Sequence, residues 1–99
     1  MTIQEVLNSI GLPVAYSHFK QKQKLPFIVY VGNGQEQFVA DNNFYYKQNS
    51  YRIEFYYKNK NEKIEEKIEK ALCESGYLYE KSEDIYIDSE NVFVIYYYV

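Results

Sequence analysis

The last eight residues of this 99-residue chain, Val92 to Val99, are all apolar or aromatic, and none is charged. In a strand, alternate side chains point to opposite faces. The alternation places Val92, Val94, Tyr96 and Tyr98 on one face, and Phe93, Ile95, Tyr97 and Val99 on the other. Because a small domain covers one such face with its own helices, we expect the second face to meet another layer or another copy.

Residues 2–10 have the pattern of a short amphipathic helix. Thr2 and Glu5 form a capping-box pair, in which a hydroxyl at the N-cap is followed three residues later by a carboxylate. Gly11 follows at the position where a helix commonly ends in a left-handed residue. The apolar stripe of this helix comprises Ile3, Val6, Leu7 and Ile10.

Residues 62–75 have the clearest helical pattern in the chain. Residues Asn59–Asn61 supply an N-cap, and Gly76 stands at the C-terminal left-handed position. The predicted apolar stripe comprises Ile64, Ile68, Ala71 and Leu72.

Strand patterns occupy most of the remaining chain. The predicted strands are 14–19, 27–31, 37–41, 51–58, 77–79 (continued or reopened at 85–87) and 92–99. The predicted turns are Gly32–Gly34, Asp41–Asn43, a polar turn near Lys47–Ser50, and Asp88–Asn91. We therefore predict a single α+β domain over residues 1–99, in the order α-β-β-β-α-β-β, with a mainly antiparallel sheet and both helices on one face.

Composition narrows the classes of function. The net charge of -3 and the pI of about 5.1 argue against a dedicated nucleic-acid binder, which would show a basic surplus. The one cysteine cannot form an internal disulfide, which is compatible with a reducing compartment. No apolar run approaches the roughly 18 residues of a membrane span. We therefore expect a cytoplasmic protein with no membrane partner.

Few residues offer catalytic or metal-binding chemistry, so we predict no enzyme activity, no metal and no cofactor. His18 has no sequence-identifiable nucleophile or orienting carboxylate. Cys73 falls on the acidic side of its helix near the C-terminus, which disfavours the thiolate. Residues 80–90 are rich in carboxylates but lack the spacing of a calcium loop. Gly32–Gly34 lacks the lysine and the helix of a phosphate loop.

The surplus of tyrosine predicts a surface for assembly. The chain has 13 Tyr and no Trp, and tyrosine is enriched at interfaces because it joins a flat apolar body to a polar tip. Tyr56 stands on the polar side of its own predicted strand. The candidate assembly residues are Tyr56, Tyr96, Tyr97 and Tyr98 on the sheet, with Lys20, Lys22, Lys24, Asp41 and Asn42 on polar loops.

Taken together, these segments resemble small proteins encoded among the head–tail joining genes of siphophages and prophages of Gram-positive bacteria, which are similar to the tail terminator family. The resemblance covers residues 12–99. The resemblance rests on the order and spacing of six segments: Pro26–Tyr30, Phe38–Asn42, Tyr51–Tyr56, Glu62–Leu72, Tyr79–Lys81 and Tyr86–Glu90.

The resemblance implies a structural subunit without catalytic residues. It implies a homo-oligomeric ring, typically six-fold, that closes the finished tail tube and presents a surface to the head connector. Virion assembly of this kind would take place in the bacterial cytoplasm and leave the protein in the virion neck or tail. Two alternatives remain open: another small phage connector or minor tail protein, and a host-encoded binding module with an aromatic sheet face. A small enzyme is disfavoured.

Overall fold

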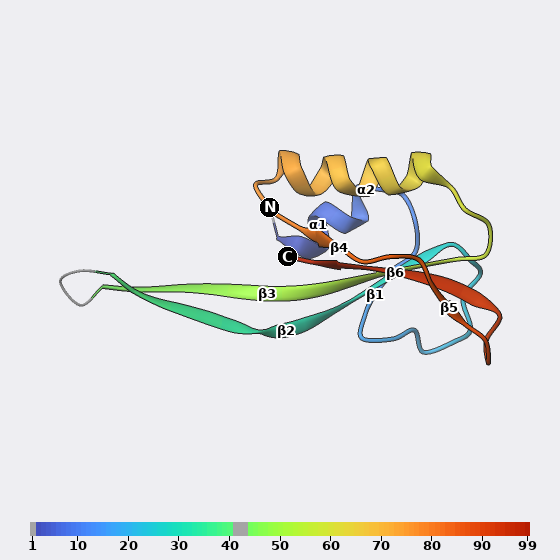
Figure 1. The fold of residues 1–99 in the computed structure, drawn as a ribbon, viewed down its shortest axis with the longest axis horizontal. Helices are drawn as coiled ribbons and strands as arrows, with labels where there is room; N and C mark the ends of the chain where they lie inside the picture. Colours follow the sequence, from blue (N-terminus) through green and yellow to red (C-terminus); the bar gives the residue numbers. More distant parts are fainter. Residues whose placement is uncertain (1, 41–43) are drawn as a thin grey trace.

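The computed structural model describes residues 2–40 and 44–99, and the side chains of these residues outside 35–49. Within them, both helices lie on the same side of one sheet (Figure 1). The elements are α1 (Ile3–Asn8), β1 (Val14–Tyr16), β2 (Phe27–Ala40), β3 (Phe44–Tyr57), α2 (Glu62–Glu74), β4 (Glu80–Lys81), β5 (Ile85–Ile87) and β6 (Val92–Tyr98). The predicted α+β class is confirmed, with three strands after α2 where two were expected.

The two helices begin and end where their capping residues predict. At α1, the Glu5 backbone N–H donates to Thr2 Oγ1 at 3.2 Å, and the Thr2 N–H donates to Glu5 Oε1 at 2.8 Å. At α2, the Ile64 N–H donates to Asn61 Oδ1 at 3.3 Å. Gly11 and Gly76 follow the helices with φ of +94° and +85°, a conformation that favours glycine.

The sheet is mixed. Its order is β1-β2-β3-β6-β4, and β5 also pairs with β6. The β1–β2 pair is parallel and the other pairs are antiparallel. Because parallel neighbours cannot be joined by a tight turn, the polar segment 17–26 serves as the return connection between β1 and β2. The interior position of β6, between β3 on one side and β4 and β5 on the other, accounts for its uncharged sequence.

Strands β2 and β3 form one continuous hairpin of 14 residues per strand, which projects from the body (Figure 1). The predicted turns at Gly32–Gly34 and near Lys47–Ser50 are therefore wrong. The β2–β3 register shifts between Gly32 and Gln35, and Gly34 has a φ of +91°, so the glycine pair forms an irregularity within a strand. The predicted turn Asp41–Asn43 lies outside the described residues.

The outer edge of β6 is covered by an interrupted strand. Residues 77–79 form no strand, and Leu78 is 91% exposed, so the prediction of a strand there is wrong. Between β4 and β5, Ser82 stays attached to β6: its N–H donates to Tyr96 O, and the Tyr96 N–H donates to Ser82 Oγ, both at 2.8 Å. The predicted turn at 88–91 is present and leads into β6.

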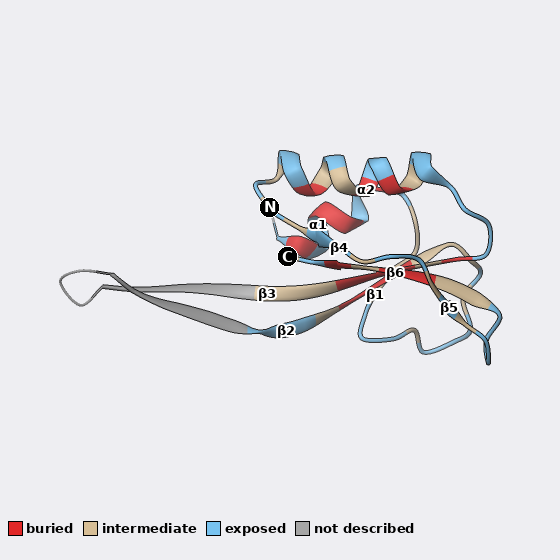
Figure 2. Cartoon of the chain, viewed as in Figure 1, coloured by how far each residue is buried: buried red, intermediate tan, exposed pale blue. Residues whose placement is uncertain are grey.

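The core lies between the helices and one face of the sheet (Figure 2). Ile68 and Leu72 of α2 are fully buried, and Ile64 and Ala71 are half-buried beside them. The predicted stripe of α1 is buried throughout. The sheet contributes Ile28, Tyr30, Ile53, Phe55, Tyr57, Ile95 and Tyr97 to the same cluster.

Candidate functional site

The sheet face turned away from the helices carries a connected group of residues, here called the open-face cluster: Arg52, Glu54, Tyr56, Tyr96 and Tyr98. Arg52 Nε donates to Glu54 Oε2 at 2.9 Å, and Tyr56 Oη donates to Glu54 Oε1 at 2.6 Å. The Arg52 guanidinium lies 5.5 Å from the centre of the Tyr96 ring. Glu54 is only 7% exposed, and both of its carboxylate oxygens accept hydrogen bonds from neighbouring side chains. These contacts hold the side chains of the cluster in fixed positions.

The phenol of Tyr56 is held in its neutral form. Burial, followed by the hydrogen bond to the Glu54 carboxylate, raises the pKa of Tyr56 well above its usual range. Tyr56 and Tyr96 are half-buried, and Tyr98 is 39% exposed. Three of the four predicted assembly tyrosines thus share one face of the sheet, because Tyr56 lies two residues from Glu54 and Glu54 pairs with Tyr96.

The fourth, Tyr97, corrects the prediction. Its side chain is completely buried on the helix face, where its Oη donates to Glu69 Oε2 at 2.9 Å. Burial and the Glu69 carboxylate raise the pKa of Tyr97. Alternation along β6 requires this placement, since Tyr96 and Tyr98 occupy the other face. Tyr97 is therefore a core residue and no part of an assembly surface.

A groove of about 1150 Å³ lies between the segment 17–25, the start of β2 and the β5–β6 turn. Aromatic rings make its floor: Phe27 packs edge-on against Phe19 and stacks on Tyr56, with both pairs of ring centres 5.2 Å apart. Val29 and Val92 also line it. Figure 1 shows the segment 17–26 passing on the side of the sheet opposite the helices.

The predicted basic loop borders this groove. Lys20, Lys22 and Lys24 are exposed, and Lys22 and Lys24 line the groove together with Lys58. The structure thus brings part of the predicted lysine loop next to Tyr56, which is also a lining residue. Asp41 and Asn42 lie outside the described residues.

The far part of the β2–β3 hairpin, here called the arm, comprises residues 33–40 and 44–50. The pairing of β1 with β2 ends at Tyr30, and the backbone hydrogen bonds between β3 and the end of the chain extend to Tyr51, which exchanges two of them with Val99. In the part of the chain that the structure describes, the two strands of the arm pair only with each other. Their register joins Phe38 to Tyr46, Val39 to Tyr45 and Ala40 to Phe44, so every residue of these three pairs is apolar or aromatic.

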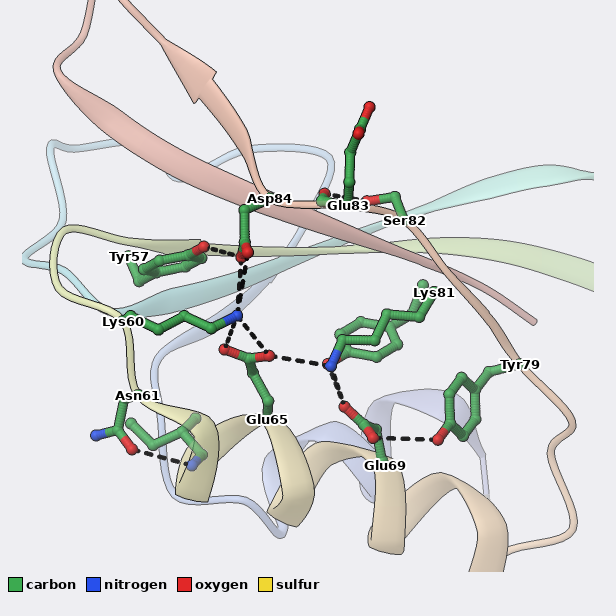
Figure 3. Close-up of polar contacts among 12 residues, drawn as sticks. Tyr57, Lys60, Asn61, Glu65, Glu69, Tyr79, Lys81, Ser82, Glu83 and Asp84 are labelled. Atoms are coloured by element: carbon green, nitrogen blue, oxygen red, sulfur yellow. Dashed lines mark hydrogen bonds and ion pairs between the residues drawn. The ribbon is translucent and has the colours of Figure 1, made fainter.

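A network of charged side chains lies between α2 and the β4–β5 edge (Figure 3). This charged network comprises Lys60, Glu65, Glu69, Lys81 and Asp84, and the sequence pattern did not reveal it. Glu65 is 2% exposed and lies between two ammonium groups. Lys60 Nζ and Lys81 Nζ each donate to Glu65 Oε1 at 3.0 Å, and Lys60 Nζ lies 2.9 Å from Glu65 Oε2. Lys60 also donates to Asp84 at 3.0 Å, and Lys81 to Glu69 at 2.8 Å. These contacts fasten α2 to the β4–β5 edge.

The shifted pKa values in the charged network follow from the contacts of its members. The hydrogen bond from the Tyr57 phenol lowers the pKa of Asp84, and Lys60 adds to the effect against some desolvation. Burial opposes ionisation of Glu69, but hydrogen bonds from Lys81 and Tyr97 outweigh it and lower its pKa. The Glu65 carboxylate, more than any other group, raises the pKa of Lys60. The lowered pKa values of Glu69 and Asp84 and the raised pKa of Lys60 all favour the charged forms of these groups, as expected for structural ion pairs.

One signal in the sequence could have revealed Glu65. It lies three residues before Ile68 and seven before Leu72, so it shares the buried stripe of α2. A carboxylate on such a stripe requires a cationic partner when it is buried. Those partners, Lys60 and Lys81, come from segments on either side of the helix, and only folding brings them together.

The residues considered for chemistry stand apart from one another. His18 is exposed, and its Nδ1 lies 3.3 Å from Ser17 Oγ. Cys73 is an exposed free thiol. Among the residues whose side chains the structure describes, no group of three or more His, Cys, Asp or Glu is arranged to hold a metal ion.

No protein-family model and no curated protein matches this chain. Within the described part of the chain, no helix has both the length and the apolar character required to cross a bilayer.

Proposed function

We propose that this chain is a structural protein of phage assembly, a tail terminator or head–tail joining subunit that forms a ring at the end of the tail tube. Its partners under this proposal are further copies of itself, the tail tube protein and the head connector. The single observation that carries the proposal is the arm, a two-stranded ribbon that leaves the body of the subunit (Figure 1).

The arm is a poor structure for an isolated subunit. The molecule measures 52 × 26 × 25 Å, and its long axis follows the hairpin. A two-stranded ribbon is marginally stable in water, and unpaired strand edges invite pairing with other chains. Residues 38–40 and 44–46 are apolar or aromatic in sequence, a composition that is common at the centre of interfaces. The arm is therefore explained most simply as a segment that a partner covers.

The position of the arm favours a ring. It projects from one end of an elongated subunit, so the surface that receives it on a neighbour must be a different one. Such heterologous contacts generate closed rings when the rotation closes, and filaments when it does not. The resemblance of residues 12–99 to tail terminators suggests where such a ring would form, at the end of a tail tube. The net charge of -3 is in keeping with a protein whose partners are other proteins and not nucleic acid.

The second candidate function is a binding module, and the groove is the observation that favours it. A lined depression beside the open-face cluster could accept a peptide or another ligand without any self-assembly. The two functions differ in what the arm does: a ring subunit needs it, and a module that uses the groove alone does not.

The test is removal of the arm. Gly32 and Tyr51 are register partners, so an Asn-Gly turn can replace residues 33–50 and close the hairpin at the edge of the body. We expect this variant to fold, because the core residues are all retained. In the phage or prophage that encodes the chain, it should give no infectious particles, and electron microscopy should show tails that overgrow or fail to join heads.

Two further variants make the result interpretable. Tyr45→Asp keeps the arm but places a charge within its aromatic end, and it should also block assembly. Lys67→Gln, an exposed change on α2, should leave assembly normal. If the folded variant without an arm yields tails of uniform length joined to heads, the proposal is wrong and the binding module becomes the better explanation.

A further inference from the structure

We infer that the arm of one copy occupies the groove of the next copy, so that subunits join head to tail. The inference rests on the proposed self-assembly and names the two surfaces that meet. The groove is lined by Phe19, Phe27, Val29, Tyr56 and Val92, and by Lys22, Lys24 and Lys58.

The two surfaces cannot meet within one subunit. Phe27, at the start of β2, lines the groove, and Ala40, at the end of β2, belongs to the arm. Thirteen residues of extended strand separate them by roughly 40 Å, at about 3.3 Å per residue. Figure 1 shows the arm at one end of the long axis and the segment 17–26 at the other. A contact between arm and groove therefore joins two copies.

The size and the lining of the groove suit a polypeptide ribbon. Its volume of about 1150 Å³ lies above the range of about 300–1,000 Å³ that is typical of small-molecule sites. The lining includes aromatic and aliphatic residues, and in the far end of the arm Phe38 pairs with Tyr46 and Val39 with Tyr45. Aromatic and aliphatic residues on both sides are the composition of a buried interface centre.

Charge favours the same pairing. Three lysines line the groove against one carboxylate, that of Glu90. In sequence, residues 33–50 contain two acidic residues, Glu36 and Asp41, and one basic residue, Lys47. The basic lining of the groove suits the small acidic surplus of the hairpin sequence and disfavours pairing of groove with groove.

The experiment is directed disulfide formation between separately purified copies. In a Cys73→Ser background, one copy carries Tyr45→Cys in the arm, and a second copy, made distinguishable by a mass tag, carries Gln21→Cys at the groove. Gln21 is exposed and lines the groove. A disulfide requires Cα atoms within about 7 Å of each other, so its formation reports close approach. The two copies are mixed at protein concentrations up to about millimolar and oxidised mildly. The yield of mixed dimer should be at least tenfold higher than that of a control pair, which combines Tyr45→Cys with Lys67→Cys on α2.

Lys22→Glu combined with Lys24→Glu in the groove copy supplies a second measurement. Both side chains are exposed, so thermal melts should be unchanged, whereas the yield of mixed dimer should fall at least threefold. A yield equal to the α2 control would overturn the inference, as would efficient crosslinking of the arm variant with itself, which indicates pairing of arm with arm.

The outcome also separates this inference from the proposed function. If the arm is required for joined tails but no mixed dimer forms, the phage function stands and the arm binds elsewhere. If the mixed dimer forms but phage assembly proceeds without the arm, the contact stands and the function in the tail is wrong.

Discussion

Replacing Glu65 by Gln tests whether the charged network under α2 stabilises the packing of the helix on the sheet. Gln has nearly the shape of Glu, so packing is preserved while the negative charge is removed. The change leaves two ammonium groups, of Lys60 and Lys81, next to a neutral amide. We expect the variant to fold to the same structure with a clearly reduced free energy of unfolding.

The magnitude follows from the contacts. Glu65 makes charged contacts of 2.9–3.0 Å with two lysines, and a hydrogen bond to a charged group is worth about 1.5–3 kcal/mol. The lysine side chains are 44% and 34% exposed, and each keeps a second carboxylate, that of Asp84 or Glu69. Because water and those partners compensate in part, the expected loss is about 2 kcal/mol, a fall in Tm of roughly 10 °C for a chain of this size.

The assay is urea denaturation followed by circular dichroism, with Glu66→Gln as the matched control. Glu66 is the next residue of the same helix and is exposed, so its substitution should change stability by less than about 0.5 kcal/mol. A double-mutant cycle with Lys81→Met should give a coupling energy of about 0.5–3 kcal/mol with Glu65→Gln. If Glu65→Gln lowers the free energy of unfolding by no more than the control does, the role assigned to the charged network is refuted.

Three further predictions follow. Ile68→Ala should cost about 2–5 kcal/mol in denaturant melts because Ile68 is fully buried, whereas the exposed Lys67→Ala should cost less than about 0.5 kcal/mol. The lowered pKa values of Glu69 and Asp84 mean that their stabilisation is present above about pH 5 and is lost as the pH falls through the folded-state values, so melts should show acid destabilisation beginning near pH 4. Under the proposed phage function, Cys73→Ser should leave complementation intact, since the thiol is exposed and outside the groove; a complete loss of particles with a folded variant would contradict this.

Local signals predicted the parts of this protein that depend on near neighbours. The capping pair of Thr2 and Glu5, Asn61 at the start of α2, and Gly76 after its end all act over a few residues, and each is found where the sequence places it. The alternation along β6 was also correct, and it should have excluded Tyr97 from the surface, because the helix stripes already required one face of that strand.

The hairpin shows why local signals failed elsewhere. A Gly-Asn-Gly sequence at residues 32–34 is typical of a turn, and the polar residues 47–50 are typical of a loop. In the structure, β2 and β3 each continue through these segments, because antiparallel pairing between the strands satisfies their backbone groups over the whole length. One register shift accommodates the glycines, and the strand continues beyond them.

The sequence by itself determined the α+β class, the two helices with their buried stripes, and the uncharged final strand, since periodicity and capping act within one element. Only the tertiary structure decided that Glu65 meets Lys60 and Lys81, that Tyr56 lies beside the groove, and that the hairpin leaves the body as an arm. Each of these depends on strand register or on contacts between separate elements of the fold, which no local pattern encodes.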